Sequence, residues 1–318
     1  MLAAGSVRGA RAQQGMGSGG APWPNRPIRL MVPFAAGGAA DSAARAITPR
    51  MGERLGQPFV VENRTGASGS VGAAAVAQAP RDGHFLLWYA SSHLVNPALM
   101  RGLGFDYAAF TPVSLVVTFP EVLAVKAELP ARMVAEFVAL ARARPGAVTV
   151  GTQGNATAGH LGLVQFARRA GIEVIHAPYR GGAGAARDLA AGVVDAAFIT
   201  TVSAGPVVDS GRARCLAVAT SGRVPSRPEV PTLAESGFPG FDSNEWVALF
   251  GPPGMPDAVV EALRAALAEA LADPGVRQRL SQIGAVPVGS PPVASARFFR
   301  EGRQEMSALV REAGIRLD

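Results

Sequence analysis

Short apolar runs and amphipathic stretches alternate along the chain from Pro27 onward. The apolar runs have the length and β-branched content of strands, and a helical pattern follows most of them. An alternation of strand and helix is typical of α/β architecture with largely parallel sheets. The predicted strands cover residues 28–34, 59–62, 85–90, 113–117, 122–125, 148–151, 174–177, 196–200, 216–220, 247–250 and 286–288.

The first predicted helix covers residues 41–55. Asp41 is the predicted N-cap, because its carboxylate can accept free backbone N–H groups of the first turn. Gly56 ends the helix. Pro49 lacks a backbone donor and collides with the preceding turn, so a kink or break is expected near Thr48. Further helices are predicted over residues 256–272, over a short stretch from Pro274-Gly275 to residue 283, and over residues 292–313.

Two extended segments, 118–130 and 239–254, have the character of crossings between groups of strands. A self-sufficient α/β block lies between them. A chain that leaves one lobe, builds a second and returns has two linkers, and this geometry gives a ligand cleft and a hinge. We therefore predict lobe 1 over residues 25–121 and 246–318, and lobe 2 over residues 122–245.

Composition narrows the class of protein. The chain has 318 residues, of which 48% are hydrophobic and 17% charged, as in an ordered globular protein. No apolar run approaches the roughly 18 residues of a membrane-spanning helix. The net charge is +6, but Lys126 is the only lysine and the arginines are dispersed. This charge is weak evidence for an anionic ligand and almost none for nucleic acid.

Residues 1–24 do not have the pattern of a folded element. They lack the apolar core of a signal peptide, although Ala10-Arg11-Ala12 before Gln13 has the form of a cleavage site. Two interpretations stay open. The segment is either the end of an export signal whose start lies upstream, or a disordered cytoplasmic leader.

Signatures of catalysis are scarce. No phosphate-binding P-loop, no G-x-G-x-x-G after a strand and no G-x-S-x-G occurs. The four histidines and the single Cys215 have no metal-ligand spacing. Cys215 lies within an apolar strand, where burial makes a thiol inert. We therefore predict no catalytic residue, no metal and no cofactor.

Loops rich in Gly, Ser, Thr and Asn connect several predicted strands to helices, at residues 33–41, 64–72, 90–93, 151–160 and 178–184. Such loops gather at the carboxyl ends of parallel strands, where ligands bind. The helix N-termini that follow favour an anion by about 0.3–1 kcal/mol per charge at exposed sites. One such loop is usually an ordinary connector, but five at strand–helix junctions predict a binding site.

Some residues of these loops allow two readings. His160 is more typical of a satisfied structural histidine than of a ligand contact. Arg180 either meets a carboxylate or is simply solvated. Trp246 is expected to pack at the hinge first and to line the cleft second.

The same loops resemble a known family. The stretches "PNRPIRLMVPFAAGGAADSAARAI", "LGQPFVVENRTGASGSVGAAAVAQAPRDGHFLL", "GTQGNATAGHLG", "VIHAPYRGGAGAARDLAAGVVDAAFI" and "FDSNEWVALFGPPGMP" occur in order over about residues 24–315. They resemble the Bug-type solute receptors, which are the extracytoplasmic binding proteins of tripartite tricarboxylate transporters.

The resemblance implies a periplasmic binding protein-like fold of type II, with two α/β lobes, a hinge and an interlobe ligand cleft. It implies a periplasmic monomer without catalytic activity that binds a small carboxylate and works with the membrane subunits of such a transporter. The loop at 33–38 would contact ligand through its backbone and ordered waters, and the loops at 66–72 and 151–160 would grip a carboxylate. The predicted ligand-binding residues are Phe34, Ala35, Ala36, Gly37, Gly38, Asp41, Ser68, Gly69, Ser70, Ser91, Thr152, Gly154, Asn155, Thr157, His160, Tyr179, Thr200 and Trp246.

The sequence departs from the family after the strand at 196–200, where a polar pair such as Asp-Asn is frequent. Ile199 and Thr200 stand there. Because an unpaired buried charge is costly, Ile199 argues against a ligand ammonium group. The predicted ligand is thus a non-amino di- or tricarboxylate, or an aromatic acid.

Three other functions remain as alternatives. The chain could be an orphan receptor that serves sensing. It could be the ligand-sensing domain of a cytoplasmic regulator, although residues 1–24 are far too short for a DNA-binding module. It could also be an enzyme on this scaffold, for which Asp41, His160, Tyr179 and Arg180 are the plausible groups.

Overall fold

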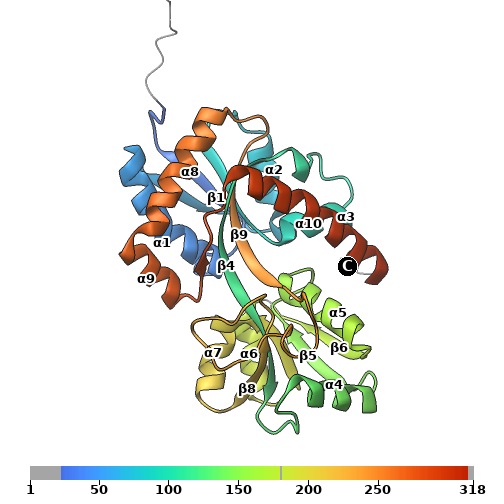
Figure 1. Cartoon of the computed structure of the whole chain (residues 1–318). Coiled ribbons are helices and arrows are strands. Elements are labelled where there is room, and N and C mark those ends of the chain that lie inside the picture. The colour runs from blue at the N-terminus through green and yellow to red at the C-terminus, as the bar shows by residue number, and fades with distance from the viewer. Residues whose placement is uncertain (1–22, 180, 314–318) are drawn as a thin grey trace, which may run out of the picture.

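The computed structural model describes residues 23–179 and 181–313 of the chain. These residues form two α/β lobes, which two strands connect (Figure 1). The connecting strands are β4 (Thr111–Lys126) and β9 (Asn244–Gly251). The predicted α/β class is confirmed.

The sheet of lobe 1 has the order β2-β1-β3-β9-β4, with β10 (Val286–Pro287) on the outer edge of β4. Strands β1 (Ile28–Val32), β2 (Phe59–Asn63) and β3 (Phe85–Ala90) are parallel, and β9 runs antiparallel to both β3 and β4. Both faces of this sheet are buried. Helices α1 (Ala39–Leu55), α8 (Asp257–Ala272) and α9 (Pro274–Gln282) pack on one face. Helices α2 (Ser70–Ala77), α3 (Ser92–Leu99) and α10 (Pro292–Ala313) pack on the other, with the short η1 (Ala67–Gly69) and η2 (Tyr107–Ala109) beside them.

The sheet of lobe 2 is built around the second half of β4. Its strands are β8 (Ala213–Val218), β4, β7 (Ala196–Thr200), β5 (Val148–Thr152) and β6 (Val174–Pro178), in that order. Strands β5, β6 and β7 are parallel to one another, and β7 is antiparallel to β4. Helices α4 (Val134–Ala143) and α5 (Ala158–Ala170) cover one face, and α6 (Gly182–Ala190) and α7 (Thr201–Asp209) cover the other.

The structure differs from the sequence at two places where a break between or within elements was predicted. Residues 113–117 and 122–125 are not separate strands, because β4 continues through Pro120. Pro120 stands at the last pair that β4 forms with β9, where the strand passes from one sheet to the other. Helix α1 likewise runs through Pro49 without a break. Ile47 and Met51, on either side of this proline, are buried against α8, so tertiary packing outweighs the lost hydrogen bond.

Asp41 is not the N-cap of α1. Gly38 holds that position, and Asp41 lies inside the first turn, where its carboxylate accepts a hydrogen bond from the Gly37 N–H. The predicted helices at 256–272, 274–283 and 292–313 are confirmed as α8, α9 and α10. Across residues 23–179 and 181–313, no helix combines the length and apolar character needed to cross a bilayer.

Candidate ligand-binding cleft

The carboxyl ends of the parallel strands in both lobes meet at the connecting strands. In lobe 1, Ala90 at the end of β3 pairs with Val247 of β9. In lobe 2, Thr200 at the end of β7 pairs with Glu121 of β4. Because β1 and β2 are parallel to β3, and β5 and β6 to β7, the loops after these six strands face one another across the hinge.

The loop between β1 and α1 presents bare backbone to solvent. Ala35, Ala36 and Gly37 are exposed, and Gly37 has a φ of 77°, which favours glycine. Behind it, buried Asp41 accepts hydrogen bonds from the Gly37 N–H, the Arg45 Nε and the Asn63 Nδ2, each at 2.9 Å. Burial alone would raise the pKa of Asp41, but these hydrogen bonds outweigh it and lower the pKa. Asp41 therefore fixes the loop as an ionised carboxylate.

The loop between β2 and α2 rests on a buried polar network. The carbonyl oxygen of Ser68 accepts hydrogen bonds from the Tyr89 hydroxyl at 2.8 Å and from the Asn96 Nδ2 at 3.1 Å. The Ser70 hydroxyl lies 2.8 Å from that of Tyr107 and also accepts from Asn96. Ser68 has a φ of 48° and is exposed, whereas Gly69 and Ser70 are buried. The network thus holds a left-handed turn that keeps Ser68 at the surface.

In the loop between β5 and α5, some residues fix the backbone through hydrogen bonds and one residue remains exposed. Thr157 is the N-cap of α5, and its hydroxyl donates to the Gly154 carbonyl at 2.8 Å. The buried Thr152 hydroxyl lies 2.7 Å from the His176 Nε2. Asn155 is exposed. Of the predicted residues in this loop, Asn155 is therefore the most accessible to a ligand.

The contacts of His160 are those of a structural residue, the reading that its sequence context favoured. Its Nδ1 accepts the Ala156 N–H at 3.1 Å, and its ring stacks on that of His176 with 3.9 Å between centroids. Burial, with a smaller contribution from His176, lowers the pKa of His160 to about 4. The ring is thus neutral at pH 7 and locks the start of α5.

We expect His160 to make stability depend on acidity. The unfolded chain binds the proton with an ordinary pKa near 6.5, and the folded protein only near 4. The stabilising effect is therefore complete above pH 6.5 and is lost as the pH falls toward 4, by up to about 3 kcal/mol. Urea unfolding of the wild type and of His160→Gln between pH 4 and 7 measures it. Parallel pH profiles for the two proteins would contradict this assignment.

Other predicted residues are engaged within lobe 2. The Tyr179 hydroxyl donates to Asp188 at 2.8 Å, and the Thr200 hydroxyl lies 2.9 Å from that of Ser203. Ile199 is fully buried in the apolar cluster beneath α6 and α7. Ile199 is therefore a core residue of lobe 2 and does not discriminate between ligands. Arg180 lies outside the described residues.

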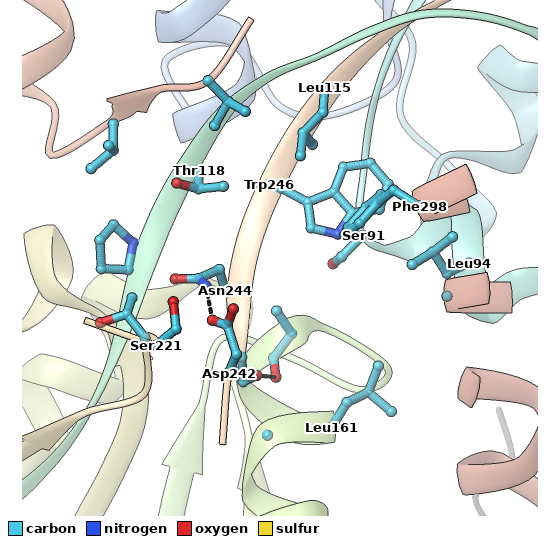
Figure 2. A pocket seen from close by; sticks show the side chains of 18 of the residues that line it. Ser91, Leu94, Leu115, Thr118, Leu161, Ser221, Asp242, Asn244, Trp246 and Phe298 are labelled. Atoms are coloured by element: carbon cyan, nitrogen blue, oxygen red, sulfur yellow. Dashed lines mark hydrogen bonds between the residues drawn. The ribbon is translucent and has the colours of Figure 1, made fainter. Parts of the chain in front are cut away.

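A cavity of about 630 Å³ lies between the lobes on the side of α10. Figure 2 shows Trp246 and Phe298 close together in its wall, with Ser91 beside them and Leu161 from lobe 2 opposite. The Trp246 ring also packs against Phe299 with 5.4 Å between centroids, so Trp246 both packs at the hinge and lines this cavity. Of the predicted residues, only Ser91 and Trp246 line the cavity. The exposed residues 35–37, 68 and 155 lie outside it.

Two carboxyl groups on the connecting strands were not among the predicted site residues. The Glu121 Oε1 accepts a hydrogen bond from the Gln153 Nε2 at 2.5 Å. The Glu245 Oε1 accepts the Ser91 N–H at 3.1 Å and the Trp246 N–H at 3.0 Å. Burial raises the pKa of both groups, and Glu245 raises that of Glu121 further. A single acidic residue inside the apolar pattern of "FPEVLAV" and of "SNEWVAL" was the available signal.

No cluster of three or more His, Cys, Asp or Glu residues that could hold a metal ion occurs within the described ranges. Two α/β lobes, two connecting strands and strand ends that face each other define the class of two-lobed solute-binding proteins.

The chain belongs to the tripartite tricarboxylate transporter family of receptors, whose family model matches residues 43–315. It is 38% identical to a UPF0065 protein in the tcbD-tcbE intergenic region of Pseudomonas sp. strain P51, over 91% of this chain and 87% of the relative. It is 34% identical to the protein BugT of Bordetella pertussis, over 93% of this chain and 91% of BugT. The predicted resemblance to the Bug-type receptors is confirmed.

Solved structures agree with this assignment. The Rhodopseudomonas palustris protein Rpa4515 with adipate has 34% identity and a TM-score of 0.81, and the match covers 92% of this chain and 99% of that one. MatC from the same organism, with bound malate, has 32% identity and a TM-score of 0.76, and the match covers 91% and 100%. The predicted periplasmic binding protein-like fold is thus confirmed.

Proposed function

We propose that this protein is a periplasmic receptor that captures a small carboxylate between its lobes. It delivers the loaded form to the membrane subunits of a tripartite tricarboxylate transporter. The family supports this role, and relatives with adipate and malate support a carboxylate ligand. The receptor acts as a monomer and without catalysis. Lobe 1 comprises residues 25–121 and 246–318 and lobe 2 comprises residues 122–245, and they close about β4 and β9.

The observation that carries the proposal is the exposed backbone at strand ends that face each other. Residues 35–37 lie just before α1, Ser68 just before α2 and Asn155 just before α5. Helix N-termini offer free N–H groups and a favourable dipole to an anion. We propose that these exposed residues contact the carboxylate, and that the buried predicted residues, such as Asp41, Ser70 and Thr152, fix the loops behind them.

A di- or tricarboxylate or an aromatic acid suits loops that grip one carboxylate from both lobes. The preference for a ligand without an amino group relied on Ile199, whose side chain lies in the core of lobe 2. We therefore withdraw that preference.

The test is native mass spectrometry of the purified full chain, followed by thermal unfolding with a panel of carboxylates. A ligand at a hundredfold excess over its Kd stabilises the folded state by about 2.7 kcal/mol. We expect one small carboxylate to co-purify or to raise the melting temperature. A panel without any shift, together with an empty mass spectrum, would refute the proposal.

A loop variant locates the site. Asn155→Ala removes an exposed amide, so we expect weaker ligand binding and unchanged stability of the empty protein. Gln278→Ala removes an exposed amide from α9 and serves as the matched control, with unchanged affinity. Equal affinities for the two variants would contradict the role proposed for Asn155.

A further inference from the structure

Glu121 and Glu245 lie on the same face of the two connecting strands. Glu245 pairs with Phe119 in the antiparallel register, and Glu121 is two residues further along β4. Alternate residues of a strand point to the same face, so the two side chains are diagonal neighbours. Glu121 is fully buried and Glu245 is half-buried.

The two carboxyl groups contact the loops of both lobes. Glu245 accepts the N–H of Ser91, which stands at the end of β3 in lobe 1. Glu121 accepts from Gln153, which follows β5 in lobe 2, and its backbone pairs with Thr200 at the end of β7. The pair therefore lies where three of the loops proposed to surround the ligand converge on the hinge strands.

With both carboxyl groups ionised, this corner of the hinge has more acceptors than donors. The Gln153 Nε2 is used on the Glu121 Oε1, which leaves the Glu121 Oε2 and the Gln153 Oε1 buried. Neither oxygen has a hydrogen-bond partner among the described residues. Within residues 23–179 and 181–313, no arginine, lysine or histidine lies within 4.0 Å of the Glu121 or the Glu245 carboxylate. Buried acceptors without a donor are costly, and a bound donor relieves that cost.

We propose that Glu121, Glu245 and Gln153 determine specificity by requiring a hydrogen-bond donor on the ligand, next to its carboxylate. The shared chemistry is a hydroxyl or an ammonium group on a small carboxylic acid. This inference rests on the proposed function, since it describes the ligand of the same cleft.

A ligand with a donor and an analogue without one differ strongly in binding free energy at such a site. A site built to bind a donor rejects an analogue that lacks it, because its own buried acceptors stay unpaired. A second ligand carboxylate at this corner would add another acceptor beside two carboxyl groups and would be repelled if all are ionised. An unsubstituted carboxylate is therefore the disfavoured ligand.

The experiment is calorimetric titration of the full chain with matched acids. One set is succinate, malate and aspartate, and the other is phenylacetate, mandelate and phenylglycine. We expect the hydroxy or amino member of a set to bind at least about tenfold more tightly than its unsubstituted partner. Malate and mandelate report a hydroxyl donor, whereas aspartate and phenylglycine report an ammonium.

The variants Glu121→Gln and Glu245→Gln keep the side-chain shape and replace one acceptor oxygen by a donor. We expect this tenfold preference to fall to about threefold or less in at least one of them, and most strongly for an ammonium ligand. Glu261→Gln on the exposed face of α8 is the control, with the preference unchanged. Unfolding curves establish that each variant is folded.

The outcomes separate the two proposals. Binding of carboxylates without any preference for a donor, or a tightest ligand that has no donor, would overturn this inference alone. A preference that survives in both variants would do the same. If no carboxylate binds at all, both the proposed function and this inference fail.

Discussion

Replacement of Gly159 by alanine is expected to destabilise the protein by about 3 kcal/mol. Gly159 is the second residue of α5, and a Cβ there would lie 2.5 Å from the backbone carbonyl oxygen of Phe198. That oxygen belongs to β7, so it cannot yield without disturbing the sheet of lobe 2. The start of α5 would have to move away from the strand ends. Urea unfolding monitored by circular dichroism measures the loss.

Gly222→Ala is the matched control for this variant. No heavy atom lies within 4 Å of a Cβ built at Gly222, and its backbone is not in the left-handed region. We expect a change within about 0.5 kcal/mol. A similar stability for the two variants would mean that α5 adapts freely, against the close packing seen here.

Replacement of Asn96 by alanine is the second large effect, with an expected loss of about 2–4 kcal/mol. Asn96 is fully buried, and its Nδ2 lies within 3.1 Å of the Ser68 carbonyl oxygen and of the hydroxyls of Ser70, Tyr89 and Tyr107. Truncation leaves a cavity and removes the common donor of this network. The Ser68 turn should loosen as well, so ligand affinity is expected to fall together with stability.

Chemical unfolding and ligand titration of Asn96→Ala test both parts. Asn25→Ala removes an exposed amide near the start of the described chain and should change neither quantity. Wild-type stability for Asn96→Ala would show that the network contributes little. Lower stability with unchanged affinity would separate the network from the ligand site.

The sequence predicted the fold well where local pattern decides structure. The alternation of apolar runs and amphipathic stretches gave the parallel strands, and the punctuation by Pro274-Gly275 gave α8 and α9. The local pattern did not show that α1 runs through Pro49 or that β4 continues through Pro120. At Pro49, burial against a distant helix compensates the missing donor, and at Pro120 the strand changes sheets. Neither circumstance is visible in a short window of sequence.

In the candidate site, too, the residues that local sequence defines were predictable and those that meet only after folding were not. The exposed glycine-rich loops were predictable, because Gly37, Ser68 and Asn155 follow recognisable strand ends. The groups behind them were not, because Asn96 and Tyr107 meet Ser70 only after the chain has folded. The pairing of Asp41 with Asn63 is equally distant in sequence. Glu121 and Glu245 looked like isolated charges, since only the antiparallel register of β4 and β9 brings them together.

The placement of β9 between β3 and β4 bears on the order in which the chain can fold during synthesis. The strands and helices of lobe 2, from β4 to β8, are contiguous and emerge together from the ribosome. The sheet of lobe 1 lacks its central strand until residues 244–251 have been made, so the edge of β3 with Trp88 and Tyr89 stays open until late. An unpaired apolar edge invites aggregation. A nascent chain stalled before β9 should therefore bind holdase chaperones through its N-terminal third.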